Sequence, residues 1–158
     1  MKCFGGGMKA LIYLILPTLL MVGCVQPLFY VPNEKKSFTG LSKSTFDNGQ
    51  VASLIHWKSG KIDGLATWWY ENGQKKEESN WKNGKMEGLV TLWYENGQKK
   101  EESNWKDGKI ISVKVWKPNG EKCPVTIVTN GNGTEVIYDE NGTEESRFTF
   151  IKGEYISE

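Results

Sequence analysis

The stretch WYENGQKKEESNWK occurs at residues 69–82 and again, letter for letter, at residues 93–106. The two copies lie 24 residues apart, and each carries the turn dipeptide Asn-Gly. A segment that recurs at a fixed spacing is typical of a repeat protein, in which each unit needs its neighbours to cover its apolar residues. The duplicated stretch therefore defines the unit to look for in the rest of the chain.

Turn signals punctuate the chain from residue 48 onward. Because both central residues of a type I′ turn need positive φ, Asn-Gly and Asp-Gly predict two-residue hairpin turns. The segments between them are too short for helices, and several are rich in strand-forming Thr, Val, Trp and Tyr. We therefore predict an all-β fold: an elongated, twisted, single-layer antiparallel β-meander of about ten strands, preceded by a signal-peptide helix. The turns are Asn48-Gly49, Ser59-Gly60, Asn72-Gly73, Asn83-Gly84, Asn96-Gly97, Asp107-Gly108, Asn119-Gly120, Asn141-Gly142 and Lys152-Gly153.

The turns also predict which residues face one another across each hairpin. If Asn72-Gly73 is central to its turn, partner numbers sum to 145, and Gly64 faces Trp81. Four of the five pairs derived in this way set a glycine opposite a large aromatic ring, which we expect to cover the bare backbone. These pairs define five repeats, starting at residues 40, 64, 88, 112 and 133. The other pairs are Gly40 with Trp57, Gly88 with Trp105, Ser112 with Ile127 and Gly133 with Phe150.

A second column of aromatic residues lies four positions before the turn glycines. Its members are Trp69, Trp93, Trp116 and Tyr138, with Thr45 at the equivalent place in the first repeat. The favoured interpretation is that these rings stabilise a thin sheet, and the alternative is a ligand-binding aromatic ridge. The second strand of each hairpin, residues 74–80 in one copy, is so polar that it predicts a sheet with water on much of both faces.

The N-terminal region carries a targeting pattern. Met8-Lys9 precedes an apolar run that ends at Cys24, and the segment resembles a bacterial lipoprotein signal in which that cysteine is lipidated. We expect residues 1–23 to be the signal peptide, 24–39 the lipidated cysteine with a tether, and 40–158 the repeat domain. An uncleaved anchor helix, or an ordinary secretory cleavage site, is the alternative. Val25 after the cysteine implies the outer membrane in a host with two membranes.

The side chains offer little for catalysis. The single histidine, His56, has no companion ligands for a metal. Adjacent carboxylates such as Glu77 and Glu78 point to opposite faces of a strand and cannot flank one bond. After removal of the signal, Cys123 is left without a partner, and is either a small buried residue or a reactive thiol. We expect no enzyme activity, no metal and no cofactor. The balance of 20 basic and 19 acidic residues argues against a nucleic-acid partner.

The pattern from Gly64 to Glu87, GLATWWYENGQKKEESNWKNGKME, resembles a MORN-type repeat. It is most similar to the bacterial variant found in proteins labelled as YwqK-type toxin–antitoxin antitoxins. The resemblance is strong over residues 64–111, fair over 40–63 and weak beyond 112. It implies an elongated β-meander without shared catalytic residues. The expected function is a binding or scaffolding module on the cell envelope, with membrane contact through Cys24 and another protein or envelope component as partner. An antitoxin-like inhibitor and a carbohydrate-binding lipoprotein are the alternatives.

Overall fold

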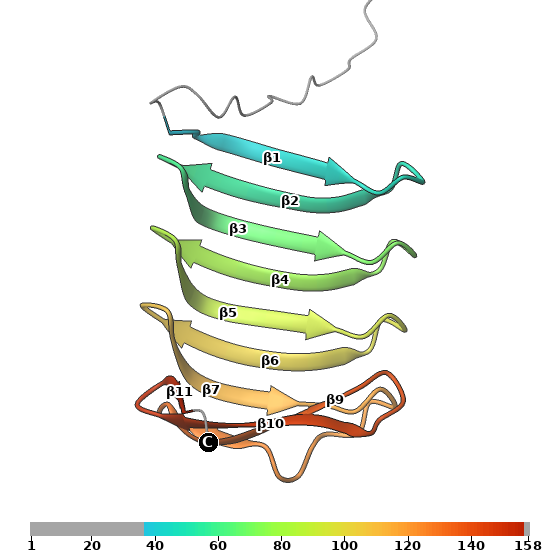
Figure 1. Ribbon diagram of the computed structural model, residues 1–158, viewed down its shortest axis with the longest axis vertical. Coiled ribbons are helices and arrows are strands. Elements are labelled where there is room, and N and C mark those ends of the chain that lie inside the picture. The colour runs from blue at the N-terminus through green and yellow to red at the C-terminus, as the bar shows by residue number, and fades with distance from the viewer. Residues whose placement is uncertain (1–36, 157–158) are drawn as a thin grey trace, which may run out of the picture.

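The computed structural model of the chain describes residues 37–156, so the predicted signal peptide, Cys24 and most of the tether lie outside the described residues. Eleven antiparallel strands form one sheet in which each strand pairs with the next along the chain (Figure 1). The all-β meander predicted from the turns is therefore confirmed. The strands are β1 (Gly40–Thr45), β2 (Val51–Lys58), β3 (Lys61–Trp69), β4 (Lys75–Lys82), β5 (Lys85–Trp93), β6 (Lys99–Lys106), β7 (Lys109–Val115), β8 (Ile127–Thr129), β9 (Asn132–Tyr138), β10 (Glu144–Ile151) and β11 (Glu154–Ile156).

Within residues 37–156 no helix is long and apolar enough to cross a membrane.

The hairpin turns are of two kinds, and the predicted type I′ geometry is right for one of them. In the Ser59-Gly60, Asn83-Gly84 and Asp107-Gly108 turns both residues have positive φ, as type I′ requires. In the other class, only the glycine has positive φ; these turns are Asn48-Gly49, Asn72-Gly73, Asn96-Gly97, Asn119-Gly120 and Asn141-Gly142. There the chain makes a wider loop: Gly73 N–H donates to the Tyr70 carbonyl and Gln74 N–H to the Asn72 side chain. The prediction was wrong for these turns, because the asparagine side chain closes the loop from a negative φ.

A bulge lies next to each of these wider loops on four hairpins, and beyond it the observed strand register agrees with the pairing predicted from the turn positions. Gly40, Gly64, Gly88 and Gly133 lie opposite Trp57, Trp81, Trp105 and Phe150. The fifth pair, Ser112 with Ile127, was wrong. Val113 pairs with Val128, and Ile127 pairs with Thr134. Extra residues around Pro124, which has no N–H to donate to a ladder, separate the bridge at Trp116 and Lys122 from β8 and shift the register.

The leading glycines are needed for their backbone conformation rather than as seats for the aromatic rings. Gly64 and Gly88 have φ values of 112° and 83°, which side-chain-bearing residues rarely adopt. A Cβ placed on Gly64 would meet only His56 within 4 Å, and one on Gly88 would meet nothing. The expectation that Trp81 and Trp105 cover these glycines is therefore corrected. Positive φ instead bends β3 and β5 at the points where the register with the preceding strand shifts.

Hydrogen bonds between turns join each repeat to the next. The side-chain amides of three turn asparagines each donate to a backbone carbonyl one repeat further on. The hydroxyls of Tyr70 and Tyr94 likewise donate, over 2.8 Å, to the carbonyls of Trp93 and Trp116. Stacking of the repeats therefore uses side chains that recur in the turns as well as the backbone hydrogen bonds between strands. The asparagine bonds run from Asn48 to Glu71, Asn72 to Glu95 and Asn96 to Pro118, over 3.2, 2.8 and 2.9 Å.

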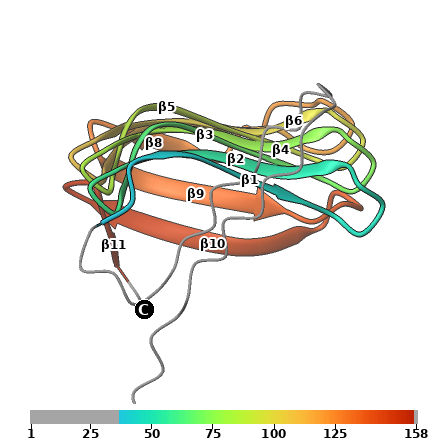
Figure 2. The ribbon, with the colours of Figure 1, turned by 90° about the horizontal axis from the view of Figure 1, so that it is seen from above.

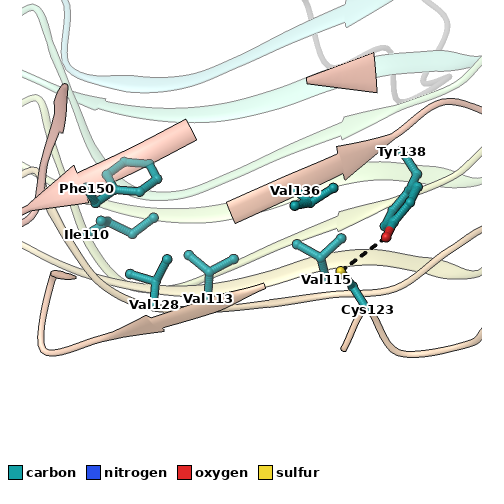
Figure 3. Close-up of a cluster of buried hydrophobic side chains, with 8 residues drawn as sticks. All are labelled: Ile110, Val113, Val115, Cys123, Val128, Val136, Tyr138 and Phe150. Atoms are coloured by element: carbon teal, nitrogen blue, oxygen red, sulfur yellow. Dashed lines mark hydrogen bonds between the residues drawn. The ribbon is translucent and has the colours of Figure 1, made fainter. Parts of the chain in front are cut away.

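The C-terminal strands fold back and give the sheet a second layer. Figure 2 shows β9 and β10 lying on one side of the sheet formed by β1–β7. We call the side of β1–β7 that faces them the inner face and the other side the outer face. The hydrophobic core lies between β7 and these strands (Figure 3), and the prediction of a single layer describes only the N-terminal strands. The core residues are Ile110, Val113, Val115, Cys123, Val128, Val136, Tyr138 and Phe150.

Backbone hydrogen bonds close the C-terminal end of the sheet. Gly153, in the turn before β11, donates to the Gly131 carbonyl over 2.8 Å and accepts from the Ile110 N–H over 3.2 Å. Gly131 in turn donates to the carbonyl of Ile111 over 2.8 Å. The last turn is thus tied to the start of β7. The opposite edge, β1, pairs only with β2 among the described residues.

Replacing Trp81 by alanine is expected to destabilise the protein by about 2 kcal/mol, because the ring is partly buried on the inner face. The indole N–H also donates to Ser79 Oγ over 2.8 Å, and that serine is fully buried. The exposed Lys76 is the control, and its change to alanine should cost roughly 0.5 kcal/mol or less. Urea denaturation measures both, and equal losses would contradict the assignment of Trp81 as a packed ring that stabilises the sheet.

Candidate functional site

Three of the four residues of the predicted aromatic ridge form a column beside the turns. Trp69, Trp93 and Trp116 are partly buried. Lysines of neighbouring hairpins lie over two of the rings: Lys75 Nζ is 5.6 Å from the centre of the Trp93 ring, and Lys99 Nζ is 5.2 Å from that of Trp116. Such cation–π contacts stabilise the column modestly and cover part of the ring faces.

Tyr138 does not belong to an exposed ridge, and its place in that prediction is corrected. Its side chain is buried in the C-terminal core, with the hydroxyl 3.3 Å from Cys123 Sγ (Figure 3). The fold-back of β9 moves this position out of the plane in which the tryptophans stack. Cys123 itself is a free, buried thiol, which agrees with the first of its two interpretations.

The single histidine lies on an exposed strand position. Its Nδ1 is 2.7 Å from the carbonyl oxygen of Leu65, at the point where β3 bends. Asn80 occupies the equivalent position in the next repeat and donates to the Leu89 carbonyl over 3.1 Å. His56 is therefore one of a series of side chains that satisfy the backbone of the bend. No group of His, Cys, Asp or Glu suited to hold a metal occurs in the part of the chain that the structure describes.

The inner face contains a cleft of about 460 Å³ beneath the C-terminal layer. Its base is a cross-strand row in which Glu77 pairs with Leu92 and Leu92 with Glu101. Glu145 and Ser146 of β10 close it from the other side. The remaining lining residues are Tyr70, Lys76, Trp93, Lys100, Val115 and Ile137. The cleft is mixed in character, with aromatic walls, two lysines and three carboxyls.

A relay of hydrogen bonds leads from the tryptophans to these carboxyls. Trp81 donates to Ser79, and Ser79 Oγ donates to Glu77 over 3.0 Å. In the second copy Trp105 donates to Ser103 over 2.9 Å, and Ser103 bonds to the carboxyl of Glu101. Burial raises the pKa of Glu77 above the ordinary value for a glutamate. The duplicated letters Glu-Glu-Ser-Asn-Trp thus build the same relay twice.

Sequence reasoning missed the most unusual group of the molecule, a buried carboxyl pair formed by Glu101 of β6 and Glu135 of β9. Their side chains hydrogen-bond to each other between the two layers, and they are only 9% and 5% exposed. Burial and the neighbouring Glu101 raise the pKa of Glu135 to about 8, and burial also raises the pKa of Glu101. The pair therefore shares one proton at neutral pH. Glu135 Oε1 has no hydrogen-bond partner among the described residues.

This pair does not form a catalytic arrangement with any nucleophile that the structure places beside it. Its neighbours are Ser103, which bonds to Glu101, and the charged groups of Glu77 and Lys100. Ser103 is fully buried; its Oγ accepts from the Trp105 indole N–H, and the same hydroxyl bonds to Glu101. What the arrangement can do is hold a proton between two layers and make their contact depend on pH.

Comparison with known proteins finds a similarity over the central hairpins. Residues 62–83 and 86–107 each match the MORN repeat variant. No curated protein matches the sequence. The two matches cover the hairpins β3–β4 and β5–β6 except Lys61 and Lys85, and each ends at the first residue of the type I′ turn that follows. Their boundaries start two residues before the leading Gly64 and Gly88. MORN repeats are often binding or scaffolding modules.

Proposed function

We propose that this protein is a non-enzymatic binding or scaffolding module of a bacterial cell envelope, anchored by lipid on Cys24. The observation that carries the proposal is the repetition of the outer face. Lys75 and Glu78 form an ion pair, and Lys99 and Glu102 form the same pair one repeat later. The tryptophan column repeats with them, and so do the leucines that follow the leading glycines, Leu41, Leu65 and Leu89. A surface that presents one set of side chains at a regular interval suits an extended partner.

The relation to YwqK-type bacterial proteins and the envelope location rest on sequence patterns. The positively charged start, the apolar run and Cys24 support export and lipidation. Two or more acyl chains would hold the protein stably on a membrane, whereas a single chain would not. The partly covered tryptophan rings give less support to carbohydrate binding than to protein binding.

Mass spectrometry of the mature protein is expected to find Cys24 as the acylated first residue. Fractionation should place the protein with envelope membranes, and the Cys24→Ser variant should leave that fraction. A retained Met8, or an unmodified Cys24, would refute the anchor. Recovery of the wild type with the cytoplasm would favour the antitoxin-like alternative, since the inhibitor of a cytoplasmic toxin has to stay inside the cell.

Photo-crosslinking in intact cells tests the binding role. A crosslinker at Lys99 samples the outer face, and one at Glu145 samples the cleft. Capture of one defined envelope protein from the outer face supports the proposal. Turnover of a substrate in a hydrolase screen, abolished by a single substitution in the cleft, would replace it with an enzymatic function.

A further inference from the structure

The outer face carries a column of unusual cross-strand pairs beside the type I′ turns. Lysine lies directly opposite lysine at the end of three successive hairpins, and all six side chains are exposed. Like charges opposite one another on a sheet destabilise it. The pairs are Lys58 with Lys61, Lys82 with Lys85 and Lys106 with Lys109.

The same strands avoid such repulsion at their other end. There Lys75 and Lys99 each have a glutamate three residues away as an ion-pair partner. Within residues 37–156, only Lys109 of these six paired lysines has an ion-pair partner, Glu154 at 2.8 Å. Three further carboxylates lie near the column: Asp63 and Glu87, which accept the N–H groups of Asn83 and Asp107 over 2.9 and 2.8 Å, and Asp107 itself, so that with Glu154 four carboxylates stand against six lysines. The column keeps a net positive charge.

Exposed leucines run parallel to the lysines on the same face. Leu65 pairs with Asn80, and Lys82 follows Asn80 by two residues, so Leu65 and Lys82 share a side of the sheet. The same relation joins Leu89 to Lys106 through Asn104, and Leu41 to Lys58 through His56. The leucines are 50%, 41% and 46% exposed at positions 41, 65 and 89. We call the three leucines and the six lysines the lysine–leucine stripe.

The interval along the stripe matches a particular secondary structure. Neighbouring leucines are two strands apart, which is about 9.5 Å at the usual strand spacing. An α-helix advances about 10.5 Å in seven residues, so a helix lying across the strands can present one apolar side chain to each leucine. Acidic residues along its flank would then meet the lysine pairs. Nucleic acids and acidic polysaccharides offer the negative charge but no aliphatic side chains for the leucines.

We propose that the lysine–leucine stripe is the docking surface for an acidic amphipathic α-helix of a partner protein. The inference rests on the proposed binding function and names the class of partner. Three leucines require about 15 residues of helix, with an apolar residue at every seventh position. Binding removes the leucines from water and relieves the repulsion between paired lysines.

The test uses the full chain in detergent and a labelled synthetic helix of about 20 residues with leucine at every seventh position and glutamate beside it. Fluorescence anisotropy should show saturable binding that weakens with salt. Replacing the peptide's leucines by glutamine, or its glutamates by lysine, should each weaken binding about tenfold or more. Equal binding of the glutamine-for-leucine peptide would overturn the proposal.

Matched double variants locate the surface. Lys82→Gln with Lys106→Gln should raise the Kd of the acidic peptide about tenfold, whereas Lys76→Gln with Lys100→Gln, which line the cleft on the inner face, should change it less than about twofold. Equal effects of the two doubles would overturn the assignment. So would displacement of the peptide by micelles of anionic phospholipid at concentrations where unlabelled peptide fails. If the Lys99 crosslinker captures an envelope partner while the stripe ignores the peptide, the proposed function survives and this inference fails.

Discussion

Replacing Gly133 by alanine is expected to cost on the order of 4 kcal/mol, the largest effect of any single glycine change in the sheet. A Cβ at this position would lie 1.8 Å from the carbonyl oxygen of Ile127, and φ is +133°. The clash is with backbone of the neighbouring strand β8, so no side-chain rotation relieves it. The alanine should push β9 away from β8 and open the C-terminal core.

Gly88 provides the matched control, because it holds the equivalent position in a central repeat. A Cβ there meets nothing within 4 Å, although φ is +83°. Alanine at Gly88 should therefore cost about 1 kcal/mol from backbone conformation alone. Urea denaturation of both variants separates the cost of the steric clash from the cost of the positive φ. Equal losses would mean that the close approach of Ile127 to Gly133 does not control stability.

The buried carboxyl pair predicts that stability falls as pH rises. Glu135 has a folded pKa of about 8, above the ordinary 4.5, so the folded state holds a proton that the unfolded state releases between these values. The slope of stability against pH is therefore negative in this window. The contribution is fully present below about pH 4.5 and is lost as pH rises through about 8.

The Glu135→Gln variant should lack most of this fall, because an amide resembles the protonated acid and can still donate to Glu101. We expect it to be more stable than the wild type at pH 8 by on the order of 2 kcal/mol, and about equally stable at pH 5. Thermal melts across that range measure the difference. The exposed Glu95→Gln change is the control and should run parallel to the wild type. A constant difference between Glu135→Gln and wild type at every pH would contradict the shared proton.

Turn residues predicted the register because their geometry is local. Asn72-Gly73 places Gly64 opposite Trp81 whatever lies elsewhere, since the ladder propagates from the loop. The same local rule assigned the wrong loop type, because the asparagine side chain that closes it was not considered. The rule also predicted the wrong strand pairing after Trp116, because the residues around Pro124 do not form a simple hairpin.

The candidate site was beyond prediction for a different reason. Glu77 and Glu101 occupy the same place in two identical segments, yet Glu101 is buried against Glu135 and Glu77 is only partly buried. Tyr70 and Tyr94 differ in the same way. The distinction arises solely from β9 folding over the later copy. No window of sequence around either glutamate contains that information.

The identity of the two copies has a consequence for the length of the chain as well as for packing. Deletion of residues 70–93 creates no new junction, because Trp69 would then be followed by Tyr94 just as it is followed by Tyr70 now. The product loses β4 and β5 as a unit, and with them Leu89 and the Lys82–Lys85 pair. The remaining strands should still pair into one sheet, which would be about 10 Å shorter at the usual strand spacing. Length variants that differ by whole multiples of 24 residues thus keep both the junction sequence and the strand pairing, and each 24-residue step changes the length of the outer face by two strands.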